Sequence, residues 1–209
     1  MCKNILPADT GVKFLFLMHP KEAYRQKTGT GRLAALSLVD SEILIGIDFT
    51  YNERLNELLS GTGAGQNLFP VVLYPASNAY FTDTASFRTD IGSKKLMVIV
   101  VDATWFFALR MVKLSTNLYP LPKLSFKNAY RSQFQFKRQP APECLSTIES
   151  CYYLLEELKL AGIANNQVDV SGLMETFHTM VHRQLACEQS RRVSEADERI
   201  PKNPPVSGN

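Results

Sequence analysis

The sequence lacks the usual marks of membrane, secreted and zinc-binding proteins. No apolar run approaches the roughly 18 residues that cross a bilayer, and the opening stretch MCKNILPADTG has no apolar signal-peptide core. No CxxC spacing occurs among the four cysteines, so neither a zinc site nor a disulfide framework is indicated. These cysteines are Cys2, Cys144, Cys151 and Cys187. We therefore expect a cytoplasmic protein with reduced thiols, no metal and no membrane partner.

Acidic residues are absent from one long stretch, 103–142. The acids gather instead in 40–57 and from 143 onward, although the net charge of the chain is only +3. Seven basic residues lie in the acid-free stretch: Arg110, Lys113, Lys123, Lys127, Arg131, Lys137 and Arg138. This asymmetry predicts one positive sector on the folded surface.

The length and composition are those of one soluble globular domain. The chain has 209 residues, of which 45% are hydrophobic and 21% charged, which suffices for a full core. We expect residues 1–188 to form a single domain. The polar and Pro-rich stretch 189–209 predicts a disordered tail.

One buried strand organises the rest of the chain. Residues 96–101 are an unbroken apolar run rich in β-branched residues, which is typical of a strand inside a parallel sheet. Asp102 and Trp105 follow directly, and then an apolar-rich helical stretch begins. Because ligands of open α/β sheets bind at the carboxyl ends of the strands, we expect Asp102 and Trp105 to lie at the functional site.

The remaining pattern alternates strands with helices. Strands are predicted at 12–18, 42–47, 69–74 and 123–126, and helices at 32–38, 50–59, 146–160 and 171–188. The predicted class is therefore α/β, with a mainly parallel sheet flanked by helices.

Two short motifs have both a structural and a functional interpretation. The turn of Gly29, Thr30 and Gly31 opens a helix, so it either holds an anion on free backbone N–H groups or marks a helix start with an unusual glycine angle. Ser146 and Glu149 form an S-x-x-E capping box, which explains both residues structurally.

Aromatic and basic residues interleave between 126 and 138. Cations meet phosphates and rings stack on unpaired bases, so this mixture favours RNA binding. The alternative is a loop whose rings anchor it to the core while its cations stay in water. The residues are Phe126, Lys127, Tyr130, Arg131, Phe134, Phe136, Lys137 and Arg138.

Five segments in this order resemble the DTW-domain family of tRNA-uridine aminocarboxypropyltransferases. They are HP with KTGTGRL (19–20 and 27–33), YPAS (74–77), DATW (102–105), LP with AYR (121–122 and 129–131) and LSTIE (145–149). Many members also carry a cysteine-rich segment before the first strand, of which Cys2 alone would be a remnant here.

The resemblance implies a SPOUT-like fold with a C-terminal trefoil knot that binds S-adenosylmethionine. It also implies transfer of the 3-amino-3-carboxypropyl group to N3 of a uridine in tRNA. Alternatives are an rRNA-directed transferase of the same group, a SPOUT-type RNA methyltransferase, and an RNA-binding protein without turnover. Monomer and homodimer both stay open.

Residue roles follow from the same resemblance. Asp102 would be the base or would orient the uridine and the cofactor electrostatically; its structural alternative is a helix N-cap. Trp105 would pack on the cofactor; its alternative is a core tryptophan. The other residues expected to bind the cofactor are Thr30, Gly31, Pro75, Ala76, Ser77, Leu121, Leu145, Ser146 and Thr147. Those expected to bind RNA are Arg25, Lys27, Arg32, Tyr130, Arg131 and Arg138.

Overall fold

The fold is built on a parallel sheet of six strands. The computed structural model describes residues 5–26, 29–134 and 144–197, with side chains up to residue 191. The order across the sheet is β2-β1-β5-β3-β6-β4, and every pairing is parallel. The strands are β1 (Lys13–Met18), β2 (Ser41–Ile45), β3 (Leu68–Leu73), β4 (Tyr80–Phe81), β5 (Lys95–Asp102) and β6 (Lys123–Ser125). The predicted α/β class is confirmed, and so is the central place of β5, which lies between β1 and β3.

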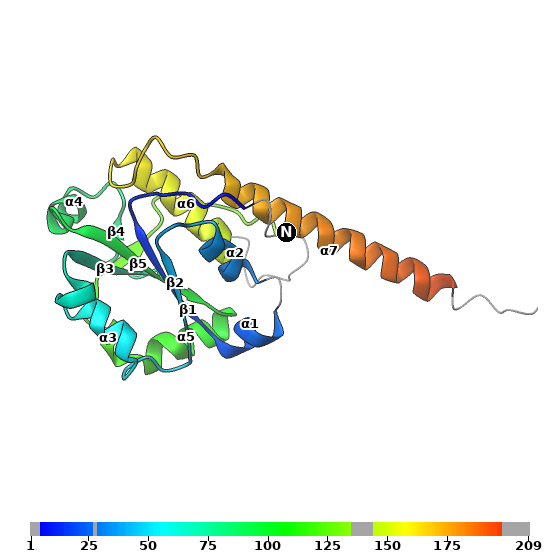
Figure 1. Cartoon of the computed structure of the whole chain (residues 1–209), viewed down its shortest axis with the longest axis horizontal. Coiled ribbons are helices and arrows are strands. Elements are labelled where there is room, and N and C mark those ends of the chain that lie inside the picture. The colour runs from blue at the N-terminus through cyan, green and yellow to red at the C-terminus, as the bar shows by residue number, and fades with distance from the viewer. Residues whose placement is uncertain (1–4, 27–28, 135–143, 198–209) are drawn as a thin grey trace, which may run out of the picture.

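Helices cover both faces of the sheet (Figure 1). One face packs against α2 (Thr30–Leu36), α4 (Ala85–Ile91), α6 (Thr147–Leu160) and α7 (Ser171–Asp197). The other face packs against α3 (Glu53–Leu59) and α5 (Trp105–Leu114). Side chains alternate along each strand, so Phe14 and Phe16 enter the first layer while Leu15 and Leu17 enter the second.

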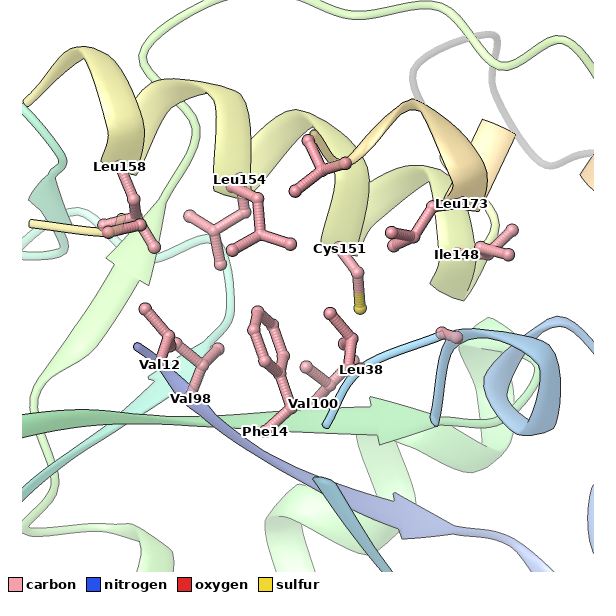
Figure 2. Packing of buried hydrophobic residues seen from close by; sticks show 14 of the residues in the cluster. Val12, Phe14, Leu38, Val98, Val100, Ile148, Cys151, Leu154, Leu158 and Leu173 are labelled. Carbon is pink, nitrogen blue, oxygen red and sulfur yellow. The ribbon is translucent and has the colours of Figure 1, made fainter. Parts of the chain in front are cut away.

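The larger core lies under α6 (Figure 2). Leu154, Leu158 and Cys151 of this helix point toward Phe14 and Val98 of the sheet. All five side chains have no exposed surface. This packing fixes the position of α6, and the first turn of the helix reaches the carboxyl end of β5.

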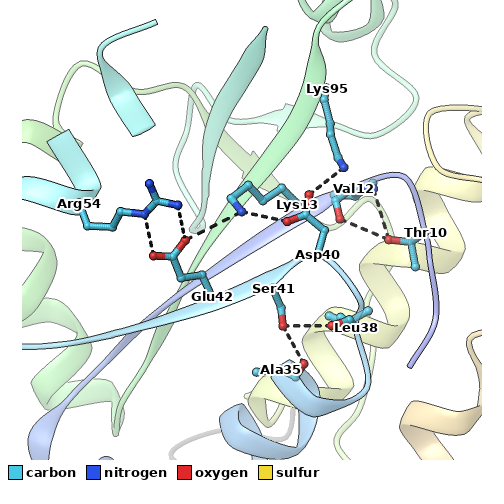
Figure 3. Close-up of polar contacts among 10 residues, drawn as sticks. All are labelled: Thr10, Val12, Lys13, Ala35, Leu38, Asp40, Ser41, Glu42, Arg54 and Lys95. Atoms are coloured by element: carbon cyan, nitrogen blue, oxygen red, sulfur yellow. Dashed lines mark hydrogen bonds and ion pairs between the residues drawn. The ribbon is translucent and has the colours of Figure 1, made fainter. Parts of the chain in front are cut away.

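Ion pairs tie together the amino ends of the strands (Figure 3). Asp40 bonds Lys13 of β1 at 2.9 Å and Lys95 of β5 at 2.7 Å, while Glu42 bonds Arg54 at 2.8 Å. The Lys95 and Lys13 cations hold the pKa of Asp40 below its usual range, although burial opposes the shift. The charges at this end of the sheet therefore neutralise one another.

Some elements differ from the sequence prediction. The helices α1 (Pro20–Arg25) and α4 and the two-residue strand β4 were not predicted, because each is too short to show a clear period. The last helix does not end at Glu188 but continues to Asp197, so 189–197 is helical rather than part of a disordered tail. The rest of the predicted tail, 198–209, lies outside the described residues. Among the described helices, none is both long enough and apolar enough to span a membrane.

Candidate active site at the carboxyl end of β5

Asp102 ends β5 and is 5% exposed. The Thr147 hydroxyl, from the first residue of α6, donates a hydrogen bond of 2.6 Å to its Oδ1. The N-cap of α5 is Thr104, so Asp102 does not cap that helix and this structural alternative is wrong. The carboxylate instead connects the central strand to α6.

Gly31 lies directly against this carboxylate. A Cβ built on Gly31 would lie 2.2 Å from Asp102 Oδ2, a distance that real atoms do not adopt. Gly31 has no positive φ, and the N-cap Gly29 has an extended backbone with φ −65°. Gly31 is therefore needed because the Asp102 carboxylate lies too close for a Cβ. The alternative that glycine supplies an unusual backbone angle at this helix start is wrong.

Two helix starts thus meet at Asp102. Thr147 is the first residue of α6, and Gly31 is the second residue of α2. The unpaired N–H groups and the dipole of a helix N-terminus favour negative charge. Cys151, one turn further along α6, feels this charge: burial raises the pKa of its thiol, and the Asp102 carboxylate raises it further. This edge of the sheet is thus built around a buried carboxyl group.

Trp105 begins α5, three positions after Asp102 ends β5, and is 49% exposed, so it is not a core tryptophan. Its ring lies parallel to that of Tyr74, with centroids 6.4 Å apart and planes at 4°. Tyr74 follows β3 and opens an exposed loop of Pro75, Ala76 and Ser77. Leu121 packs against the same apolar cluster as Tyr74. Trp105 and Tyr74 therefore form an aromatic wall at the carboxyl edge of the sheet, with this loop next to it.

The capping box is confirmed at the start of α6. Ser146 donates from both its backbone nitrogen and its hydroxyl to Glu149 Oε2, at 2.8 Å and 2.6 Å. The Ser146 side chain is thus engaged in the cap. Leu145 is half-buried before the cap, and Thr30 is half-buried at the start of α2.

The aromatic and basic loop is fastened to α6 by two buried glutamates. Glu157 accepts from Tyr130 at 3.0 Å, from Thr82 at 3.0 Å, and from the backbone N–H groups of residues 127 and 128 at 3.2 Å. Glu149 accepts from Ser132 at 2.8 Å. Each glutamate is at most 4% exposed. Both carboxylates therefore hold the loop in place.

The rings of this loop pack inward over the described residues. Phe126 and Phe134 contact the core, and Tyr130 stacks on Tyr153 with centroids 4.1 Å apart. Lys127 and Arg131 stay exposed. The rings of residues 126–134 are thus anchored to the fold, and RNA binding by this loop stays a prediction. Phe136, Lys137 and Arg138 lie outside the described residues.

Among the residues expected to bind RNA, those that the structure describes do not form one group. Arg25 is exposed at the end of α1, whereas the guanidinium of Arg32 donates to the Ala23 carbonyl at 2.6 Å. Tyr130 bonds Glu157, ten residues along α6 from Thr147, which corresponds to about 15 Å. Lys27 lies outside the described residues. Arg25 and Arg32 therefore lie on or near α1, whereas Tyr130 lies over the later turns of α6 and Arg131 is exposed.

His19 has a role that the sequence analysis missed. Its backbone N–H donates to the Asp102 carbonyl at 3.0 Å, and its ring caps α1 by accepting from the Lys21 N–H. The ring also stacks on Phe107 of α5 with centroids 4.3 Å apart. Burial lowers the pKa of His19, and the charges of Lys21 and Arg110 lower it further. Pro20 at the first helical position was the available signal.

The buried Asp102 carboxylate between two helix starts lies at the carboxyl edge of a parallel sheet, which is where ligands of open α/β sheets bind, so this edge is the candidate site. Over the described residues, no group of three histidine, cysteine or acidic side chains is placed to hold a metal.

The family model of the DTW domain matches residues 1–185, and the chain belongs to this family.

One relative extends the comparison. The mouse (Mus musculus) protein named tRNA-uridine aminocarboxypropyltransferase 2 is 29% identical over 157 residues, which cover 74% of this chain. The chain spans about half the length of that relative, 50%. No solved structure matches the chain.

Proposed function

We propose that this protein transfers the 3-amino-3-carboxypropyl group of S-adenosylmethionine to N3 of a uridine in tRNA. The observation that carries the proposal is the buried Asp102 carboxylate, which Thr147 bonds and Gly31 approaches closely, at the same edge of the sheet as the half-exposed Trp105. The DTW family and the name of the mouse relative support it. The SPOUT-like arrangement with a C-terminal trefoil knot belongs to the same proposal.

The residues at this edge fit a positively charged co-substrate. S-adenosylmethionine carries a sulfonium and an α-amino group, and both are stabilised by a nearby carboxylate and by the face of an aromatic ring. Asp102 supplies the carboxylate, and Trp105 with Tyr74 supplies the rings. The remaining contacts would come from Thr30, Gly31, Pro75, Ala76, Ser77, Leu121, Leu145, Ser146 and Thr147.

When bound, the co-substrate supplies an electrophilic carbon on its amino-acid arm. A bond forms between uridine N3 and this carbon, the carbon–sulfur bond breaks, and the electron pair leaves with sulfur as methylthioadenosine. The N3 proton is only weakly acidic, so the reaction gains from a positioned base. Asp102 accepts this proton or stabilises the charges around it, and Thr147 fixes the orientation of its carboxylate.

The aromatic wall decides which carbon reacts. A sulfonium has three electrophilic carbons, and the one that faces the nucleophile is transferred. Trp105 and Tyr74 present nearly parallel rings on one side of the site. We assign to this wall the task of turning the methyl group away while the amino-acid arm faces the RNA.

Nucleoside mass spectrometry tests the proposal. Unmodified tRNA is incubated with the purified protein and S-adenosylmethionine, beside a control without protein. One aminocarboxypropyl unit gained on uridine supports the proposal. One methyl group gained would replace it with a methyltransferase. No gain on tRNA, together with a gain on small-subunit rRNA, would replace tRNA by rRNA, and binding of tRNA with no gain on either RNA would leave a binding protein.

A further inference from the structure

We propose that the exposed face shared by α1 and α5 is the docking surface for a single-stranded part of the tRNA. This inference rests on the proposed function and deepens it, because it names a surface that no residue role above includes apart from Arg25. The surface consists of Lys21, Tyr24, Arg25, Phe106, Leu109 and Arg110.

The two helices form one continuous surface. Phe107 of α5 joins them, since His19 stacks on its ring and the Lys21 ammonium lies 4.4 Å from the ring centroid. Phe106 contacts the same ring edge-on, with centroids 5.5 Å apart. Figure 1 shows α1 beside α5 at the same end of the sheet. A ligand that touches Lys21 therefore has Phe106 within its reach.

Large rings are exposed on this surface among the residues that the structure describes. Phe106 is 71% exposed and Tyr24 is 74% exposed, and Leu109, one turn from Phe106 on α5, is 42% exposed. Burying such side chains in the core would stabilise the fold, whereas here they face water. Flat rings on the surface offer stacking platforms for unpaired bases, and every base has a face that stacks.

The charge of the surface complements RNA. The sequences of α1 and α5 contain one acidic residue, Glu22, which is 9% exposed. Within the described residues, Lys21, Arg25 and Arg110 form no ion pair, in contrast to the paired Lys13 and Lys95 at the amino ends of the strands. Unpaired cations beside exposed rings suit phosphates next to unstacked bases. An apolar protein partner would leave these cations without counter-charges.

The position of the surface also fits the reaction. Asp102 ends β5 and α5 begins three positions later, while the Asp102 backbone carbonyl accepts from His19, which precedes α1. RNA bound across α1 and α5 would thus lie at the edge of the sheet that holds the carboxylate. The sequence of α5 has no acidic residue, and a carboxylate there would repel the phosphates.

Equilibrium binding of an unmodified tRNA transcript to the full chain tests the inference, without S-adenosylmethionine so that turnover plays no part. We expect Phe106→Ala to weaken binding by about five- to a hundredfold, as for the loss of one stacked base. Arg110→Ala should weaken it and lower the slope of log affinity against log salt by about one. Matched controls are Leu160→Ala, at an 89% exposed position, and Arg88→Ala, beside Gly162. Both should bind like the parent protein.

The inference is overturned if Phe106→Ala and Arg110→Ala bind tRNA no more weakly than the two controls. It is also overturned if the parent is a dimer that Phe106→Ala dissociates with unchanged tRNA affinity, because the face is then an interface between copies. Failure of the proposed function would be detected by a different measurement: the parent protein would add no aminocarboxypropyl group to tRNA. Calorimetric titration with S-adenosylmethionine should give the same affinity for Phe106→Ala and the parent.

Discussion

The hydroxyl of Thr147 donates a 2.6 Å hydrogen bond to the carboxylate of Asp102, joining the first turn of α6 to the end of the central strand. The two residues are 45 positions apart in the sequence. Their contact sets the direction of the carboxylate, and Gly31 closes the other side. The acid is therefore oriented by the fold before any ligand arrives.

Replacing Thr147 by valine tests this relationship. The variant keeps the shape of the side chain but removes the donor to a buried carboxylate, so we expect the free energy of unfolding to fall by about 1.5–3 kcal/mol. Transfer should slow as well, with kcat reduced more than substrate affinity. Thr147→Ser should restore most of both losses.

Urea denaturation measures the stability, and Thr89→Val is the matched control. The Thr89 hydroxyl donates to the Ala85 carbonyl at 3.0 Å on an exposed face of α4, and its loss should cost no more than about 0.5 kcal/mol. Equal stabilities of Thr147→Val and Thr89→Val would contradict the assigned role of the Thr147 hydroxyl.

Gly31→Ala should displace Asp102. The added methyl group would lie 2.2 Å from Oδ2, so the strand end or the helix must shift, at a cost of about 1–3 kcal/mol. Gly172→Ala is the control, because a Cβ there meets nothing within 4 Å and alanine favours a helix by up to about 1 kcal/mol. Thermal unfolding should therefore move in opposite directions for the two variants. A Gly31→Ala protein as stable as Gly172→Ala would show that the carboxylate does not need this space.

Glu157→Gln should loosen the loop of 126–131. The buried carboxylate accepts hydrogen bonds from Thr82, Tyr130 and the loop backbone, and an amide group cannot accept all of them. We expect a loss of about 2–3 kcal/mol in stability and faster trypsin cleavage after Lys127 and Arg131. Glu156→Gln is the control, since Glu156 is 43% exposed and pairs with Lys159 in the neighbouring turn. Cleavage at the same rate in both variants would remove Glu157 from this role.

Cys151 should resist alkylation in the folded protein. Its thiol is fully buried, and burial together with Asp102 raises its pKa, so the reactive thiolate is not formed near pH 8. Cys187 is exposed and should react. Peptide mass spectrometry after iodoacetamide treatment measures both positions, with and without denaturant. Modification of Cys151 as fast as Cys187 in the native protein would contradict the placement of α6.

Much of the fold could be predicted from the sequence, because continuous apolar runs mark buried strands and spaced apolar residues mark helices. The run at 96–101 predicted β5 to within one residue at each end, and the capping box placed the start of α6. The motifs also placed Asp102 and Trp105 at the carboxyl edge. These features depend on residues that are neighbours in the sequence, so they can be recognised without the structure.

The missing parts depend on contacts between distant segments. The sequence shows no reason for Glu157 to be buried, because its partners lie 27 to 75 positions away. The need for Gly31 arises only when α2 meets Asp102 in space. The prediction that Tyr130 binds RNA stays untested, but one face of its ring is already covered by Tyr153, a contact that no spacing rule could reveal.

The central claim is that Asp102 serves an aminocarboxypropyl transfer, and the small product released from S-adenosylmethionine tests it most directly. Chromatography of the reaction with tRNA should show methylthioadenosine from the parent protein. The same amount of Asp102→Asn should release almost none while binding tRNA with unchanged affinity. Release of S-adenosylhomocysteine by the parent, or equal methylthioadenosine from both proteins, would contradict the account.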